Sequence, residues 1–137
     1  PRVSAAAAGP AGRGSEGERL LLSIDDDPSM EPLLQKMLGS SGYRVVAAQG
    51  PSSAVADARR LRPQVILLDL LMPERDGADV LAELRLDPAT RDIPVIVVSV
   101  VDPAEVPADV DGHVSKPLDT GALLAALAQS EAPKAGV

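Results

Sequence analysis

Short apolar runs that stop at polar residues are the clearest pattern along this chain. Three runs rich in Leu, Ile and Val each end at a carboxylate or a hydroxyl: residues 20–24 before Asp25, residues 65–68 before Asp69 and residues 95–98 before Ser99. Such runs are typical of strands buried on both faces, as in a parallel sheet covered by helices. Because parallel sheets place their sites at the carboxyl ends of strands, we expect the functional site where these polar residues meet.

Helical patterns alternate with the apolar runs. The chain reads strand, helix, strand, helix, strand, helix, strand, loop, strand, helix, which predicts a doubly wound α/β fold with a five-stranded parallel sheet. Asp27 and Pro28 suit the N-cap and first position of the first helix, but Pro32 would remove a backbone donor one turn later, so the regular helix is expected to start later. A strand and two helices are expected at residues 44–48, 52–61 and 78–86.

Compositional shifts divide the chain into one domain with a tail at each end. Its 137 residues suffice for a single core but not for a second folded unit. Residues 1–18 are dominated by Ala, Gly, Arg, Ser and Pro without periodicity, which predicts a flexible linker. The domain is predicted at residues 19–130 and a short tail at residues 131–137. Because the sequence begins without Met, we expect a piece of a longer protein or a processed chain.

Charge and composition narrow the classes of function. The formal net charge of −7 disfavours direct nucleic-acid binding, which relies on clustered Lys and Arg to neutralise phosphates. The absence of Cys excludes disulfides and thiolate metal sites, and a cytoplasmic location is the expectation. No apolar stretch reaches the roughly 18 residues that span a bilayer, so we expect no membrane contact by this segment.

Four motifs, taken in order, give the chain a resemblance to a known family. They are Ile24-Asp25-Asp26-Asp27-Pro28, then Leu67 to Pro73 with Asp76-Gly77, then Val97-Val98-Ser99, and finally Lys116-Pro117. The set resembles the response regulator receiver domain of two-component signalling over roughly residues 19–129. The resemblance implies a flavodoxin-like sheet of order 2-1-3-4-5 and a phosphoryl donor that is a histidine kinase or a histidine phosphotransfer domain. The C-terminal receiver of a hybrid histidine kinase would look like this.

The resemblance also implies a chemical role for the polar residues. Asp69 is implied as the phosphoacceptor, whose carboxylate attacks phosphorus to form an acyl phosphate. Mg²⁺ would be held by Asp26, Asp69 and the backbone carbonyl of Leu71, with Asp25 reached through water, and such oxygen ligands suit this ion. Lys116 would pair with Asp69 and then with the phosphoryl oxygens.

Two residues are implied as a switch that reports phosphorylation. The hydroxyl of Ser99 would move to bond the phosphoryl group. His113, the only histidine, lies three residues before Lys116, where the family usually has Tyr or Phe. Because His titrates near neutral pH, its movement could depend on protonation as well as on phosphorylation. The alternatives for His113 are a half-buried side chain without such a role, a metal ligand or a phosphorylation site.

The sequence departs from the family between Ser99 and Lys116. The sixteen residues 100–115 are fewer than the family uses for its fourth helix, and Pro103 and Pro107 lie among them. We therefore expect a short turn or loop, and a shortened or missing fourth helix. Val100 could restrict access to the phosphoryl group. Leu71 has no polar side chain to orient a hydrolytic water, so we expect a long-lived phosphoryl form.

Two other classes of function fit parts of the pattern. A degenerate receiver could act only as a protein-binding scaffold, which the short segment after Ser99 permits. A phosphatase of the haloacid-dehalogenase type also uses a strand-end Asp, Mg²⁺ and a Lys, but it needs a second Asp two residues after the nucleophile, where this chain has Leu71. Whether two copies form a homodimer stays open, because the segment that departs from the family belongs to its usual dimerisation surface.

Overall fold

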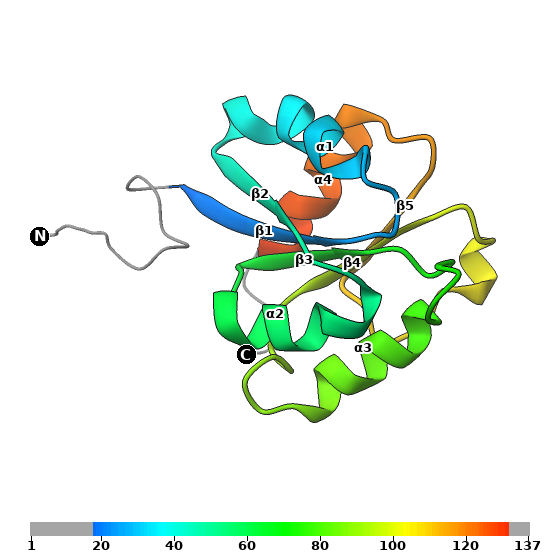
Figure 1. Cartoon of the computed structure of the whole chain (residues 1–137). Coiled ribbons are helices and arrows are strands. Elements are labelled where there is room, and N and C mark those ends of the chain that lie inside the picture. The colour runs from blue at the N-terminus through cyan, green and yellow to red at the C-terminus, as the bar shows by residue number, and fades with distance from the viewer. Residues whose placement is uncertain (1–17, 132–137) are drawn as a thin grey trace, which may run out of the picture.

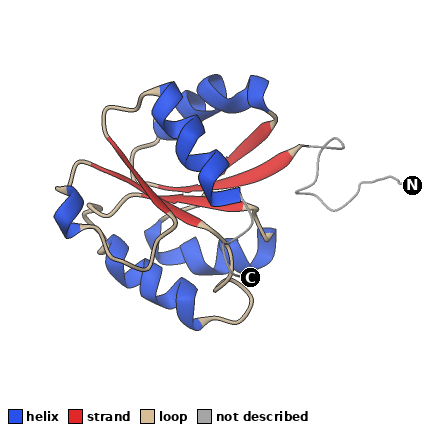
Figure 2. Cartoon of the chain, turned by 180° about the vertical axis from the view of Figure 1, so that it is seen from behind, coloured by secondary structure: helices blue, strands red, loops and turns tan. Residues whose placement is uncertain are grey.

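A five-stranded sheet lies between two layers of helices in this computed structural model, which describes residues 18–131 (Figures 1 and 2). The strands follow the order β2-β1-β3-β4-β5, and every neighbouring pair is parallel. Their bounds are β1 (Arg19–Ile24), β2 (Tyr43–Ala47), β3 (Val65–Leu68), β4 (Val95–Ser99) and β5 (Gly112–Ser115). The predicted doubly wound fold and its strand order are confirmed.

Two helices cover each face of the sheet. In Figure 1, α1 and α4 lie above the sheet, and α2 and α3 lie below it. The helices are α1 (Met30–Leu38), α2 (Ala54–Leu61), α3 (Gly77–Leu86) and α4 (Thr120–Glu131). Single 3₁₀ turns, η1 (Gly39–Ser41) and η2 (Pro51–Ser53), precede β2 and α2. Each predicted element is present, with bounds that differ by one or two residues.

The apolar runs are continuous because both faces of each central strand are buried. On β1, Leu21 belongs to the core cluster that includes Leu34 of α1 and Leu123 of α4. Its neighbour Leu22 belongs to the cluster on the opposite face, with Ala58 of α2 and other side chains of α3. Successive strand residues point to opposite faces, so only a run without polar interruptions can fill both cores.

The first helix begins at Met30 rather than at Pro28. The N-cap position is Ser29, whose side chain makes no capping bond. Asp27 instead accepts hydrogen bonds at its Oδ1 from the Ser29 amide, at 2.9 Å, and from the Ser29 hydroxyl, at 2.8 Å. The assignment of Asp27 and Pro28 to the N-cap and first helical position is therefore wrong. The later start is confirmed, and it places Pro32 in the first turn, where backbone amides have no partner within the helix.

The connection from β4 to β5 lacks the α-helix of the other crossovers, as predicted. Its residues 100–111, all of them described, contain a single 3₁₀ turn, η3 (Pro103–Glu105), which Asp102 caps by accepting from the Ala104 amide. The segment stays close to the sheet, and its partly buried Val101, Val106 and Val110 pack on the core cluster beside α2 and α3. A short segment with apolar side chains packed on the core thus takes the place of a helix.

Both predicted tails fall mostly beyond the described part of the chain. Residues 1–17 of the predicted linker and residues 132–137 of the predicted C-terminal tail lie outside the described residues. The domain bounds of 19–130 therefore stay a prediction. Within residues 18–131, no helix combines the length and the apolar character that crossing a membrane would require.

Candidate functional site

Asp25 and Asp69 are brought together because their strands are neighbours in the sheet. Ile24 pairs with Leu68 in the register of β1 and β3, and the Asp69 amide donates to the Ile24 carbonyl at 3.0 Å. Each carboxylate follows the last residue of its strand. Asp25 and Asp69 are more than forty positions apart in the chain, and the pairing of their strands brings them together, as the sequence predicted.

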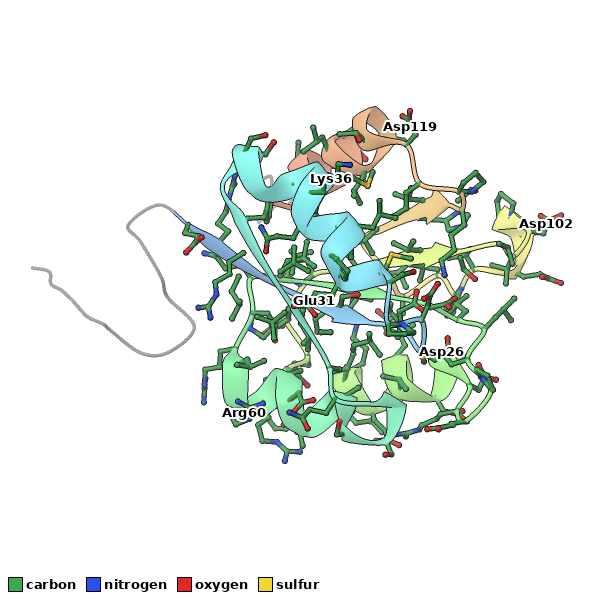
Figure 3. The ribbon with its side chains drawn as sticks, turned by 45° about the horizontal axis from the view of Figure 1, so that its top comes forward. Asp26, Glu31, Lys36, Arg60, Asp102 and Asp119 are labelled. Carbon is green, nitrogen blue, oxygen red and sulfur yellow. The ribbon has the colours of Figure 1, made fainter. Side chains whose placement is uncertain are left out.

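Three carboxylates gather at this edge of the sheet. Asp25, Asp26 and Asp69 each offer an oxygen atom, and these atoms lie within 4.8 Å of one another. The side chains of Asp25 and Asp69 are only 5% and 7% exposed, whereas Asp26 is exposed. Figure 3 places Asp26 beyond the end of β1, beside the start of α1. Three like charges this close favour a bound cation.

Lys116 lies between the two buried carboxylates. Its Nζ is 3.0 Å from Asp25 Oδ2 and 3.3 Å from Asp69 Oδ2. Burial alone would lower the pKa of Lys116, but its hydrogen bond to Asp25 and the charges of Asp25 and Asp69 outweigh burial and raise this pKa. The ammonium is therefore fixed in its charged form next to Asp69. The peptide bond from Lys116 to Pro117 is cis.

The carboxylates open into a cleft large enough for a phosphoryl group. The cleft has a volume of about 510 Å³. Its lining includes the three carboxylates and Lys116, together with Leu71 and Val100. Leu71 and Val100 are 56% and 65% exposed, so the cleft has an apolar rim. Asp69 keeps a fixed orientation because its Oδ1 accepts a hydrogen bond from the Leu71 amide at 3.1 Å.

Ser99 and His113 each carry one buried side-chain atom that lacks a hydrogen-bond partner within residues 18–131. Ser99, at the end of β4, is fully buried, and its Oγ has no hydrogen-bond partner among the described residues. The Nε2 of His113 on β5 is also buried and lacks a partner within that part of the chain. Strand alternation directs both side chains to the sheet face of α2 and α3. A buried polar atom without a partner costs free energy, so a second state that supplies a partner gains stability relative to this one.

The structure thus brings together most of the residues that the sequence nominated. Asp25, Asp26, Asp69, Leu71 and Lys116 line one cleft. Ser99 and His113 lie on the adjoining strands and do not line this cleft. Sequence reasoning missed the closer partner of Lys116, which is Asp25 rather than Asp69. The only sequence signal for this contact was the run of three consecutive aspartates after β1.

The donor set of the cleft fits Mg²⁺. Hard divalent cations prefer oxygen ligands, and Mg²⁺ usually binds through one or two carboxylates while it keeps several waters. Two nearly buried carboxylates and one exposed carboxylate within 4.8 Å match that requirement. The exposed mouth at Asp26 leaves room for water ligands.

Comparison with known proteins finds relatives of similar sequence and solved structures of similar fold. The chain is 34% identical over 110 residues to the DNA-binding dual master transcriptional regulator RpaA of Synechocystis, covering 77% of this chain and 46% of RpaA. The chain therefore spans about half the length of this curated relative. The crystal structure of a sensor protein from Polaromonas is 27% identical and superposes with a TM-score of 0.74, covering 82% of this chain and 94% of that one.

A third match and a family model complete the comparison. The receiver domain of the sensor histidine kinase PA1611 of Pseudomonas aeruginosa, solved with magnesium coordinated in its active-site cleft, has a TM-score of 0.70. It is 24% identical and covers 84% of this chain and 99% of its own, so it supports the fold. The model of the response regulator receiver domain matches residues 21–128, which are most of the described domain. The chain belongs to the response regulator receiver domain family.

Proposed function

We propose that this domain is the phosphoacceptor of a two-component phosphorelay, and that Asp69 receives the phosphoryl group from a histidine kinase or a histidine phosphotransfer domain. One observation carries the proposal: the Asp69 carboxylate shares an open cleft with Asp25, Asp26 and Lys116. A carboxylate at a strand end needs such neighbours to attack a highly charged phosphoryl group.

The transfer exchanges one bond to phosphorus for another. An Asp69 oxygen forms a bond to the phosphorus of the donor phosphohistidine while the P–N bond breaks, and the electron pair of that bond leaves with the imidazole nitrogen. The product is an acyl phosphate on Asp69. Lys116 lies 3.3 Å from Asp69 Oδ2, so its charge is already close to the place where the phosphoryl oxygens would arrive, and it would exchange its contact with Asp69 for contacts with them.

Mg²⁺ belongs to the proposal as the cofactor of the cleft. Asp26, Asp69 and the Leu71 carbonyl would hold it directly, and Asp25 would reach it through water. The bound ion would supply positive charge for the phosphoryl oxygens. The carboxylate cluster supports this assignment, and so does the magnesium in the similar PA1611 receiver.

The decisive experiment is phosphorylation of the full chain by acetyl phosphate in the presence of Mg²⁺, followed by intact-mass measurement. We expect a gain of about 80 Da in the wild type. The gain should disappear in Asp69→Asn and after chelation with EDTA, and it should persist in Asp92→Asn, a matched control at an exposed position. A wild-type chain that gains no mass would overturn the proposal and leave the scaffold function as the better reading.

We further propose that Ser99 and His113 report the phosphorylated state. A phosphoryl group on Asp69 would offer an acceptor to the Ser99 hydroxyl, which has no partner among the described residues, and its movement would open space for His113. Beryllofluoride with Mg²⁺ should then shift the amide resonances of β5. Ser99→Ala and His113→Ala should reduce these shifts, whereas the exposed Ser115→Ala should not. Unchanged shifts in both variants would refute the switch.

The setting of the domain is also a proposal. Similar structures come from a sensor protein and a sensor histidine kinase, which supports a receiver attached to a hybrid kinase in the cytoplasm. RpaA, a DNA-binding regulator, represents the other arrangement. The sequence on either side of this receiver in the full-length gene distinguishes them, because an adjacent kinase core would establish the hybrid arrangement.

A further inference from the structure

Gly77 occupies a place where a side chain has no room. It is the first residue of α3, and a Cβ built on it would lie 2.4 Å from the carbonyl oxygen of Asp69 and 2.5 Å from Cα of Leu70. Non-bonded carbon atoms rest at about 3.5–4.0 Å, so relief requires a movement of about 1 Å. Both obstructing atoms belong to the backbone, and no side-chain rotation can make the space.

The backbone that meets Gly77 is fixed from several directions. The Asp69 amide donates to the Ile24 carbonyl of β1 at 3.0 Å, and the Gly77 amide donates to the Leu70 carbonyl at 3.1 Å. A bridge also pairs Leu71 with Asp76. The side chain of Leu70 is buried in the core, as are Val80 and Leu84 of α3. Neither the strand end nor the helix can move away without breaking such contacts.

The same backbone positions the reactive atoms. One Asp69 oxygen is held by the Leu71 amide at 3.1 Å, and the other lies 3.3 Å from Nζ of Lys116. The Leu71 carbonyl, which would bind the cation, lies two peptide groups after the peptide that joins Asp69 to Leu70. A displacement of the chain at Asp69 and Leu70 therefore reaches the nucleophile and a proposed ligand together.

We propose that Gly77 is a positioning residue for the phosphoacceptor: because it has no side chain, the first turn of α3 lies directly against the Asp69–Leu70 backbone and fixes the Asp69 carboxylate in the cleft. This inference rests on the proposed function of Asp69. Gly77 touches no reacting atom and acts only through the backbone it supports. Displacements of about 1 Å from reacting geometry cost about 10²-fold in rate, which sets the expected size of the effect.

The test compares Gly77→Ala with two control variants in the full chain. Gly50→Ala adds the same methyl group at a glycine with nothing within 4 Å. Asp76→Ala removes the side chain that caps α3 at the Ala78 amide, so it destabilises the same helix start without a clash. The measurements are the phosphorylation rate at saturating acetyl phosphate and Mg²⁺, the urea midpoint, and the amide resonance of Leu71, which reports its bond to Asp69.

We expect Gly77→Ala to lower the saturated rate about 10²-fold and to shift the Leu71 resonance. Asp76→Ala should lower the urea midpoint but keep the wild-type rate and resonance, and Gly50→Ala should resemble the wild type. If Gly77→Ala is folded and reacts at the wild-type rate, or loses no more rate than Asp76→Ala of similar stability, the inference is wrong.

The inference about Gly77 can still be tested if Gly77→Ala does not fold or if the wild type is not phosphorylated. If Gly77→Ala does not fold, insertion of one glycine between Asp76 and Gly77 displaces the contact without adding a side chain, and a wild-type rate in that variant overturns the inference. If the wild type gains no phosphoryl group, the proposed function fails. The Leu71 resonance then still decides whether Gly77 fixes the Asp69 loop, since a resonance that is unchanged in Gly77→Ala refutes it.

Discussion

Lys116 makes the stability of the fold decrease at alkaline pH. Its pKa is raised above the ordinary value of 10.5 because Asp25 and Asp69 together outweigh the burial that would lower it. A raised pKa in the folded state means that the pair of ion contacts stabilises the fold fully below pH 10.5 and loses that contribution as pH rises through the folded value. The free energy of unfolding should therefore fall above this pH.

The prediction is tested by urea unfolding of the wild type and of Lys116→Met between pH 9 and the most alkaline pH at which both stay folded. The wild type should lose more stability than the variant as pH rises. Lys36→Met, which changes a lysine of the last turn of α1, should keep the wild-type slope. Parallel slopes for the wild type and Lys116→Met would contradict the assigned pKa direction.

Leu71 sets the expected lifetime of the phosphoryl group. Its side chain is 56% exposed at the rim of the cleft, where a hydrolytic water would approach Asp69, and it offers that water no hydrogen bond. We predict that Leu71→Gln accelerates dephosphorylation by up to roughly 10²-fold, since a positioned polar group can orient the water. Loss of the added mass over time measures this rate. Leu71→Met is the apolar control, and a wild-type half-life of seconds would count against the predicted long-lived form.

At the scale of elements, Arg85 binds the end of residues 100–111, the segment that replaces the missing helix. Arg85 of α3 donates from Nη1 to the carbonyls of Arg91 and Ile93, each at 2.9 Å, and from Nη2 to Asp111 Oδ2 at 3.2 Å. The same Asp111 oxygen accepts from the Val95 amide at the start of β4. The guanidinium thus joins α3, the loop before β4 and the end of the crossover.

This arrangement predicts that losing Arg85, whose side chain is 17% exposed, costs more stability than losing an exposed arginine. Arg85→Met should lower the free energy of unfolding by about 2–3 kcal/mol, because hydrogen bonds to charged groups each contribute roughly 1.5–3 kcal/mol and the partly buried Ile93 carbonyl and Asp111 carboxylate would each lose a donor. Arg59→Met is the control, since Arg59 is 55% exposed and its pair with Asp87 is worth at most about 1 kcal/mol. Urea unfolding measures both. Equal losses would show that Arg85 is an ordinary surface residue.

The strands and helices differ in how well the sequence predicts them. The strands and the meeting of Asp25 with Asp69 are predictable, because a two-sided apolar run has few alternatives to a central parallel strand. The missing helix is predictable from the length and prolines of residues 100–115. The start of α1 is not, since Asp27 and Ser29 are both good capping residues and Pro32 moves the choice by two positions.

Contacts between distant segments mark the limit of such prediction. The bond of Lys116 to Asp25 depends on how β1, β3 and β5 end relative to one another, and no local pattern encodes that. Gly77 reads as part of a motif, but only the structure brings its Cα against the backbone of Asp69. Arg85 has no periodicity or motif that would single it out from other surface arginines.

At the scale of the whole molecule, three of the carboxylates that give the chain its net charge of −7 are concentrated at the site. Like charges at the Asp25, Asp26 and Asp69 cluster oppose folding, and a cation bound only by the folded state relieves them. If the cluster binds Mg²⁺ as proposed, we expect the stability of the domain to depend on this ion even before any phosphoryl group is present.

Magnesium should raise the melting temperature without a phosphoryl donor. At a free Mg²⁺ concentration 100 times its Kd, mass action adds about 2.7 kcal/mol, which corresponds to a rise of roughly 10 °C for a domain of this size. Asp26→Asn should show a smaller rise, yet unfold no more easily than the wild type without Mg²⁺, because the change removes an exposed like charge and no described hydrogen bond of the cluster. Asp92→Asn should keep the full rise. If NaCl at equal ionic strength stabilises as much as Mg²⁺, or if Asp26→Asn responds like the wild type, general screening of the acidic surface explains the effect and the cluster does not bind the ion.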